Sequence, residues 1–382
     1  MPLLVGVPSE SAPGEGRVAL APDAVRRLAK AGIEVVVERG AGDQAYLTDA
    51  AFEAAGARLG SRAEALAAPV VATVRGLAQA DLDGLSEGAI VIGLLRPLDE
   101  ADTVRALAAS GATALAMELV PRTTKAQKMD ALSAMSTVAG YRAALLAALH
   151  LPKFFPLLTT AAGTVRPAKV LVLGAGVAGL QALATARRLG SVTAAYDVRA
   201  AAREQVESVG ATFVELDLET GDAEDAGGYA KALAEEQQAR QVAALATKIA
   251  DYDAVITTAL IPGRPAPLLI TEAGVAGMRP GSVIVDLAAP NGGNCAATQP
   301  GTPHSHAGVT ILGPLDLAAE MPLHASEMYA RTVAALITDF HDDGAFRLDL
   351  DDEILAGAVV THGGAVVNER VQTSLSPAPE PS

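Results

Sequence analysis

Short apolar runs alternate with segments of mixed polarity through the first third of the chain. The runs have no polar face, which is typical of strands buried in a parallel sheet. Such strands are expected at Leu3–Val7, Ile33–Val37, Pro69–Val74, Ala89–Leu94 and Ala112–Met117. Helical spacing of apolar positions between them predicts helices at Pro22–Ala31, Asp49–Ala55 and Asp99–Ala109. This alternation predicts a parallel sheet that helices cover on both faces.

A long apolar segment from about Lys128 to Ala148 predicts a helix that ends before Pro152 and leads into a second domain. Its buried strands are expected at Val170–Leu173, Ala254–Thr257, Ser282–Asp286 and Val309–Leu312. A helical pattern returns near Glu327–Phe340 and would cross back to the first domain. The predicted fold class is α/β, with two parallel-sheet domains joined by long helices. Their expected limits are residues 1–127 with 327–373, residues 128–326, and a disordered tail at 374–382.

The composition suits large buried cores, since 50% of the residues are hydrophobic and 19% are charged. A net charge of −15 argues against a nucleic-acid partner, because such proteins cluster Lys and Arg. Cys295 is the only cysteine, so no intrachain disulfide is expected. Neither a signal peptide nor an uninterrupted apolar run of membrane-spanning length is expected, which favours a cytosolic protein. His304 and His306 are expected in an exposed loop without metal-ligand spacing, so no metal site is predicted.

The most specific pattern is KVLVLGAGVAGLQALATARRLGSVTAAYDVR, which predicts a strand, a tight turn, a helix and a second strand. Gly174 permits the turn, Gly176 lets the backbone approach a pyrophosphate, and Gly179 lets the helix pack closely on the strand. Val177 and Ala178 begin the helix, whose N–H groups and positive dipole end would face the phosphates. The pattern therefore predicts a dinucleotide site; glycines that serve only packing are the alternative.

Asp197 ends this pattern, where a carboxylate can accept hydrogen bonds from the hydroxyls of an adenosine ribose. A 2′-phosphate beside Asp197 would bring like charges together, so NAD(H) is favoured over NADP(H). Arg199, which follows Val198, could instead pair with such a phosphate. These three residues complete the predicted ribose site.

Thr258, Ala259 and Leu260 follow a predicted strand, as does the turn 286–294. Ligands of open α/β sheets bind beyond the carboxyl ends of the strands, so both turns are candidates for lining the nucleotide. The alternative is ordinary turn chemistry from Gly, Pro and Asn.

An acidic segment at 217–230 contains Gly228 and Tyr229 and predicts an exposed, mobile loop. A tyrosine that follows two glycines could fold over a bound nucleotide as a lid. A surface loop without such a role is the alternative.

Arg122, Gln127, Asp130 and Ser133 lie in the segment RTTKAQKMDALS, before the long predicted helix. Gln127, Asp130 and Ser133 are spaced three apart, so at a helix start they would share a face. Such a group could hold an amide, and a nicotinamide carboxamide is one. The alternative makes Asp130 or Thr124 a helix cap and Arg122 a solvated charge.

Several ordered motifs together resemble one family, the proton-translocating nicotinamide nucleotide transhydrogenases. The resemblance is to their NAD(H)-binding component, and it covers the chain from Leu3 to about Val371. It rests on RTTKAQKMDALSAMSTVAGYRA, TAAGTVRPAKVLVLGAGVAGLQALATARRLG, DVRAAAREQVESVGA, AGGYAKAL, ITTALIPGRPAP and GSVIVDLA.

This resemblance implies two Rossmann-like domains with NAD(H) in a cleft between them, and a homodimer. It implies that Arg122, Gln127, Asp130 and Ser133 face the nicotinamide and its ribose, and that Tyr229 belongs to a mobile loop that closes on the nucleotide. NADH would pass a hydride directly to NADP⁺ on a separate NADP(H)-binding subunit. A membrane proton-channel subunit would couple this transfer to proton movement and hold the chain, peripherally, on the cytoplasmic side of the inner membrane.

Alanine dehydrogenase shares this two-domain plan and is the enzymatic alternative. That family uses a lysine, a histidine and a late aspartate, and here Arg75, Leu95 and Pro290 stand at about those places. Arg17 is retained, but it could equally serve the shared fold. Without a proton acceptor, amine oxidation has no catalytic route. A non-enzymatic NAD-binding regulator is the third possibility.

Overall fold

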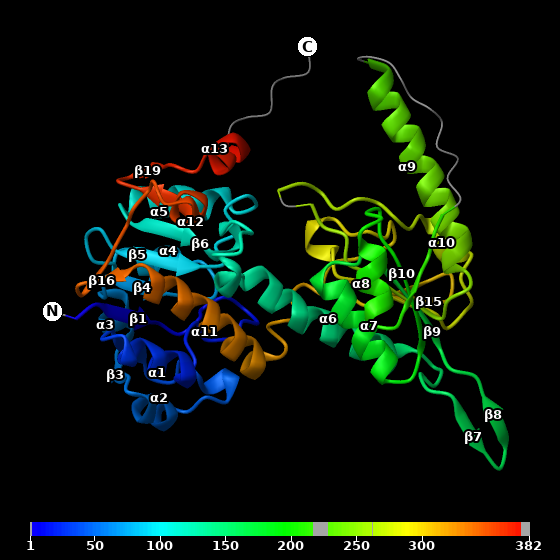
Figure 1. Cartoon of the computed structure of the whole chain (residues 1–382), viewed down its shortest axis with the longest axis horizontal. Coiled ribbons are helices and arrows are strands. Elements are labelled where there is room, and N and C mark those ends of the chain that lie inside the picture. The colour runs from blue at the N-terminus through cyan, green and yellow to red at the C-terminus, as the bar shows by residue number, and fades with distance from the viewer. Residues whose placement is uncertain (1, 217–227, 262, 376–382) are drawn as a thin grey trace. The chain divides into compact units, whose positions relative to one another are not determined.

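The chain folds into two compact units, residues 1–135 with 318–382, and residues 136–317. A computed structural model describes residues 2–216, 228–261 and 263–375 (Figure 1). Both units are built on a largely parallel sheet, so the predicted α/β class is confirmed. The divisions between the units differ from those expected at 127/128 and 326/327.

The sheet of the first unit has the order β19-β18-β6-β5-β4-β1-β2-β3 in the described part of the chain. β18 pairs antiparallel with β6, and β19 with β18, while the remaining neighbours are parallel. The strands are β1 Leu4–Val7, β2 Glu34–Glu38, β3 Arg58–Gly60, β4 Val70–Ala72, β5 Ile90–Gly93, β6 Thr113–Ala116, β18 Val359–His362 and β19 Ala365–Val366. The predicted strands are therefore confirmed, and β3, β18 and β19 are additional.

Helices surround this sheet, as the alternating pattern predicts. They are α1 Pro22–Lys30, α2 Asp49–Ala55, α3 Arg62–Leu66, α4 Gln79–Leu82, α5 Ala101–Ala109, α11 Pro322–Asp339, α12 Glu353–Ala358 and α13 Glu369–Leu375. A small hairpin of β16 His341–Asp342 and β17 Ala345–Phe346 follows α11. α11 begins with Pro322, whose fixed φ and missing N–H suit a first helical position. α11 belongs to the first compact unit, and the sequence predicts the return of the chain to the first domain near 327–340.

The sheet of the second unit has the order β11-β10-β9-β12-β13-β15-β14, again in the described residues. All neighbours are parallel except β14 and β15. The strands are β9 Lys169–Leu173, β10 Val192–Tyr196, β11 Thr212–Phe213, β12 Ala254–Thr257, β13 Val283–Asp286, β14 His304–His306 and β15 Val309–Leu312. Its helices are α6 Ala131–His150, which continues from the first unit, α7 Val177–Arg188, α8 Ala202–Ser208, α9 Gly228–Ile249 and α10 Glu272–Ala276.

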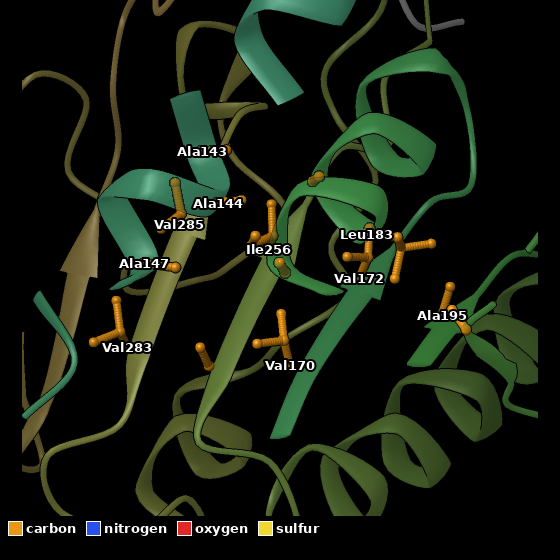
Figure 2. Close-up of a cluster of buried hydrophobic side chains, with 14 of the residues drawn as sticks. Ala143, Ala144, Ala147, Val170, Val172, Leu183, Ala195, Ile256, Val283 and Val285 are labelled. Carbon is orange, nitrogen blue, oxygen red and sulfur yellow. The ribbon is translucent and has the colours of Figure 1, made fainter. Parts of the chain in front are cut away.

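One core of this unit packs small side chains of α6 against the sheet (Figure 2). Ala143, Ala144 and Ala147 are fully buried together with Val170 and Ile256. α6 is long and apolar enough to cross a membrane by length and composition alone, and 33% of its most apolar window is buried. These alanines make it a core helix of the second unit.

A hairpin of β7 Leu158–Thr160 and β8 Gly163–Val165 extends away from the sheet of its unit (Figure 1). These strands pair only with each other, in a separate two-stranded sheet, among the residues described here. The apolar pattern did not predict the hairpin, because its strands are short and alternate weakly.

Three sequence predictions need correction. α6 begins at Ala131 rather than Lys128, because a 3₁₀ turn at Gln127–Met129 precedes it. His304 and His306 lie in edge strand β14 instead of a loop. α13 continues through Leu375, so the predicted tail does not start at 374, while residues 376–382 lie outside the described chain.

Candidate functional site

The glycine turn between β9 and α7 lies at the point where the order of the second sheet reverses. β10 and β11 extend from β9 on one side, and β12 and β13 on the other. Ligands of open α/β sheets bind at the carboxyl ends of the strands at such a switch point. The predicted glycine pattern therefore lies where the topology favours a ligand.

Each glycine of the turn meets a different steric demand. Gly174 has φ +102°, a left-handed conformation that favours glycine. A Cβ on Gly179 would lie 1.9 Å from the carbonyl oxygen of Gly174, so α7 packs directly on the turn. A Cβ on Gly176 would meet nothing within 4 Å, which leaves open space beside the backbone. That space is the kind a pyrophosphate needs in order to approach backbone N–H groups.

The first turn of α7 presents backbone donors beside this space. Gly176 is the N-cap residue, and no side chain caps the helix. Val177 and Ala178 follow, so their N–H groups lie at the positive end of the helix dipole. α6 fixes this end of α7, because a Cβ on Gly140 would lie 2.1 Å from the carbonyl oxygen of Ala178. The arrangement suits an anionic group.

The turn after β12 is tied to the glycine turn. The Thr258 hydroxyl donates to the carbonyl oxygen of Gly174 at 2.8 Å. Asn294 brackets Ala259, since its Oδ1 accepts from the Ala259 N–H at 3.1 Å and its Nδ2 donates to the Ala259 carbonyl at 2.9 Å. Leu260 is exposed beside them. The structure therefore places Thr258, Ala259 and Leu260 next to the glycine turn.

A buried carboxylate at the end of β13 holds this turn in place, a role that the sequence did not reveal. Asp286 accepts from the Thr257 hydroxyl at 2.7 Å, from the Asn294 N–H at 2.8 Å and from the Thr298 hydroxyl at 2.7 Å. Its side chain is fully buried, so these bonds offset the loss of its contacts with water. The Asp286 network positions Asn294, and Asn294 positions Ala259.

Asp197 follows β10 and turns its carboxylate back toward the glycine turn. Oδ2 accepts from the Ala175 N–H at 2.7 Å, and Arg199 forks onto both carboxylate oxygens. Burial raises the pKa of Asp197, but hydrogen bonds from Arg199 and Ala175 outweigh it and leave the pKa below its usual value. The predicted ribose acceptor is thus ionised, and Val198 between it and Arg199 is exposed.

Most of the predicted lid segment, residues 217–227, lies outside the described residues. Gly228 and Tyr229 are described, and they begin helix α9. The expectation that these two residues belong to the loop itself was therefore wrong. Their role at the nucleotide stays a prediction.

The Arg122–Ser133 segment belongs to the first unit. The Asp130 carboxylate accepts from the Ser133 N–H at 2.8 Å and from the Ser133 hydroxyl at 2.6 Å, which caps the start of α6. Arg122 and Gln127 are exposed, and the Gln127 carbonyl oxygen accepts from the Asp130 N–H at 3.3 Å. Asp130 therefore does have the capping role of the alternative interpretation. A carboxylate has about four acceptor positions, so capacity for a further donor remains.

A buried ion pair lies near the start of the first unit. Glu15 binds the Arg17 guanidinium at 2.6 and 2.5 Å, and both side chains are 2% exposed. Arg75 also approaches Glu15, with 3.2 Å between Nε and Oε2. Leu95, at about the place where alanine dehydrogenases have a histidine, is 2% exposed and packs in an apolar core. Arg17 thus has an internal carboxylate as its partner.

Two further acids of this unit were not singled out by sequence. Burial raises the pKa of Glu10 to about 7, although its carboxylate accepts from the N–H groups of Val74 and Arg75. Burial likewise raises the pKa of Glu118 to about 7, and its buried Oε2 has no hydrogen-bond partner. Neither acid lies in a recognisable motif, so only the fold shows that they are buried.

Within the residues that the structure describes, no group of three or more His, Cys, Asp and Glu is arranged to hold a metal ion.

Several known proteins are similar to this chain. The family models described as Alanine dehydrogenase/PNT match residues 6–139 with their N-terminal domain and residues 143–369 with their C-terminal domain. An NAD(P) transhydrogenase subunit alpha chain of Rhodospirillum rubrum is 46% identical over 375 residues, which cover 95% of this chain and 97% of that protein.

A solved transhydrogenase structure from Sinorhizobium meliloti matches with a TM-score of 0.87 and 44% identity, covering 95% of this chain and 100% of that one. Alanine dehydrogenase of Mycobacterium tuberculosis is 32% identical and covers 99% of this chain and 98% of its own length.

Proposed function

Since this chain belongs to the alanine dehydrogenase/PNT family, with NAD(P) transhydrogenase alpha subunits among its relatives, we propose that it is the NAD(H)-binding component of a proton-translocating transhydrogenase. The observation that carries the proposal is the glycine turn at the switch point of the second sheet. There, the open space at Gly176 and the uncapped start of α7 suit the pyrophosphate of NAD(H). The ionised Asp197 suits its adenosine ribose.

In this proposal the nicotinamide end of the nucleotide meets Arg122, Gln127, Asp130 and Ser133. Asp130 and Ser133 would hold the carboxamide through the acceptor capacity that the Asp130 carboxylate retains. Gln127 and Arg122 are exposed, as residues at the rim of a docking site must be. NADH supplies the hydride, and the chain contributes its position, because direct transfer to NADP⁺ on another subunit needs the rings roughly 3–3.5 Å apart.

The alanine dehydrogenase alternative is less well supported. Arg17 binds the internal carboxylate of Glu15, Arg75 stands near the place of that family's lysine, and Leu95 packs in an apolar core. None of these three side chains can accept a proton from an amine at neutral pH. This arrangement favours the transhydrogenase role for the chain over amino-acid oxidation.

The proposal includes a homodimer, and the β7–β8 hairpin supports it. Isolated two-stranded hairpins are at best marginally stable in water, and this one has no third strand among the described residues. Phe154 and Leu157 beside it are 56% and 58% exposed, and the segment 154–165 carries no charged residue. An uncharged apolar surface suits contact with a second copy, because each copy has a net charge of −15.

The remaining partners follow from the same assignment. An NADP(H)-binding subunit would supply the hydride acceptor, and a membrane subunit would conduct protons. The chain would then lie on the cytoplasmic side of the inner membrane, attached peripherally through these subunits.

A reconstitution assay tests the proposal. The purified chain should bind NADH, yet catalyse no hydride exchange alone and no reduction of NAD⁺ by L-alanine. Addition of a transhydrogenase NADP(H)-binding subunit should start exchange between the two nucleotide pools. Alanine-dependent reduction would favour the dehydrogenase, and NADH binding without exchange would favour a regulator. Gln127→Asn should slow exchange severely while changing NADH affinity only modestly.

A further inference from the structure

The carboxylate of Asp197 has no acceptor position left for a ribose. Oδ1 accepts from the N–H of Arg199 and from its Nε, both at 2.9 Å. Oδ2 accepts from the Ala175 N–H at 2.7 Å and from Arg199 Nη2 at 2.9 Å. A carboxylate offers about four acceptor positions, so ribose hydroxyls must replace one of these donors.

The guanidinium of Arg199 is the donor that can leave. The other two donors are backbone N–H groups that belong to the turns themselves. The Arg199 side chain is 61% exposed, whereas that of Asp197 is 6% exposed. Water can therefore solvate the guanidinium once it leaves, while ribose hydroxyls take its place at the buried carboxylate.

The same guanidinium has the chemistry of a phosphate ligand. Its fork now matches the two oxygens of Asp197, and it would match the oxygens of a ribose 2′-phosphate equally well. While the Arg199 guanidinium is hydrogen-bonded to Asp197, it is not available to a 2′-phosphate. The phosphate would also lie beside the negative charge of Asp197. Asp197 and Arg199 therefore act on nucleotide choice as a pair.

We propose that Arg199 is a specificity-determining residue of this nucleotide site. The ribose of NAD(H) binds by displacing the Arg199 guanidinium from Asp197, and Asp197 withholds that guanidinium from the 2′-phosphate of NADP(H). The inference rests on the proposed function, because it requires an adenosine ribose at Asp197.

Three variants test the two halves of the inference through equilibrium binding of NADH and NADPH, measured by calorimetry. Arg199→Met keeps the aliphatic stem and removes the competitor, so NADH should bind about two- to fivefold more tightly, because the ribose no longer has to displace a guanidinium from Asp197. Asp197→Asn keeps an acceptor for the Ala175 N–H and frees Arg199. It should weaken NADH binding and strengthen NADPH binding at least about tenfold, the effect of one charge-assisted contact. The double variant should lose this gain.

The outcomes separate the inference from the proposed function. The inference would be overturned if Arg199→Met bound NADH no more tightly than the wild type. It would also be overturned if Asp197→Asn and the double variant bound NADPH equally well. In both cases NADH binding by the wild type would leave the proposed function intact. Failure of the wild type to bind NADH would overturn both. Added salt should weaken the NADPH complex of Asp197→Asn more than that of the double variant. If Asp197→Asn does not fold, Arg199→Met alone decides.

Discussion

Alanine substitutions at two glycines of the same turn should affect stability and NADH binding differently. A Cβ on Gly179 would lie 1.9 Å from the Gly174 carbonyl oxygen, whereas one on Gly176 would meet nothing within 4 Å. Gly179→Ala should therefore lower the free energy of unfolding by about 1–3 kcal/mol, because α7 must move away from β9. Gly176→Ala should change it by less than about 0.5 kcal/mol, since the site is open and its backbone is extended.

Gly176→Ala should nevertheless weaken NADH binding about tenfold or more, because the new methyl group would stand where the pyrophosphate approaches. Urea unfolding and NADH titration of both variants check the pair. Unimpaired NADH binding by Gly176→Ala would mean that the phosphates lie elsewhere.

Burial of Glu118 predicts a pH dependence of stability. Its pKa is about 7 in the folded chain and near 4.5 as a free group, so the folded state favours the protonated form. Between these values the unfolded chain releases the proton first, and stability falls as the pH rises from about 4.5 through 7. Glu118→Gln keeps the shape without the titration, so it should be more stable than the wild type by about 1–3 kcal/mol at pH 8.

The two proteins should differ little at pH 5, where Glu118 is protonated in the folded state. Urea unfolding at both pH values provides the measurement, and the wild type is its own control for the other titrating groups. An identical difference at pH 5 and pH 8 would show that Glu118 does not titrate as its burial implies.

The residues that could be predicted are those whose role is local. The glycine turn and the acid before α6 act on neighbours within a few positions, so their spacing shows them. Asp197 was singled out by its distance from the glycines, although its partner Ala175 lies 22 positions earlier. The bonds of Asn294 to Ala259 join residues far apart in the chain, and the burial of Glu118 depends on the completed sheet. The saturation of Asp197 by Arg199 was also hidden, because it depends on a side-chain conformation.

Among the strands and helices, those with a strong local sequence pattern were predicted. The buried parallel strands were predictable because both of their faces are apolar, and α6 was predictable from its length. β3, β11 and β19 have two or three residues of mixed exposure, and β18 ends in Thr361 and His362, so none of them forms a fully apolar run. The start of α6 was misplaced because a 3₁₀ turn precedes the Asp130 cap.

The β7–β8 hairpin leads to a prediction about assembly. Leu157 precedes β7 and Val165 ends β8, and both are exposed apolar residues. The proposed homodimer of the double variant Leu157→Ser with Val165→Ser should dissociate at least about tenfold more readily, because apolar area on both copies is lost. Val192→Ser provides the control, since Val192 is equally apolar and 51% exposed on β10. Analytical ultracentrifugation measures the dimer constant, and equal effects of hairpin and control variants would exclude the hairpin as the interface.

The two sheets differ in what lies at the carboxyl ends of the strands at their switch points. In the first sheet β1 lies between β4 and β2, so its switch point is at β1 and β4, and the Glu10 carboxylate there accepts from the N–H groups of Val74 and Arg75. In the second sheet the corresponding place is the open turn at Gly176. The Glu10 side chain therefore occupies the first switch point, whereas a Cβ on Gly176 at the second would meet nothing within 4 Å. We therefore expect the pyrophosphate and adenosine of the proposed nucleotide at the second switch point.

Hydrogen exchange can show which parts of a bound nucleotide each unit contacts. ADP-ribose lacks the nicotinamide but keeps the adenosine and pyrophosphate, so it is a matched control for NADH. Both ligands should protect amides at 174–180, 197–199 and 258–260, which surround the glycine turn in the second unit. Only NADH should protect residues 122–133 of the first unit, because only its ring can reach the predicted carboxamide contacts at Asp130 and Ser133.

The comparison must be made at equal saturation, for instance at about 100 times each dissociation constant, where binding adds roughly 2.7 kcal/mol of stability for either ligand. The protection that comes from global stabilisation is then the same in both complexes. Any remaining difference in exchange at residues 122–133 is therefore local. Gly176→Ala at the wild-type NADH concentration should show less protection in both regions, since the phosphates anchor the whole nucleotide. Equal protection of 122–133 by ADP-ribose would remove the nicotinamide from this segment, and with it the proposed role of Arg122 and Gln127 in hydride transfer.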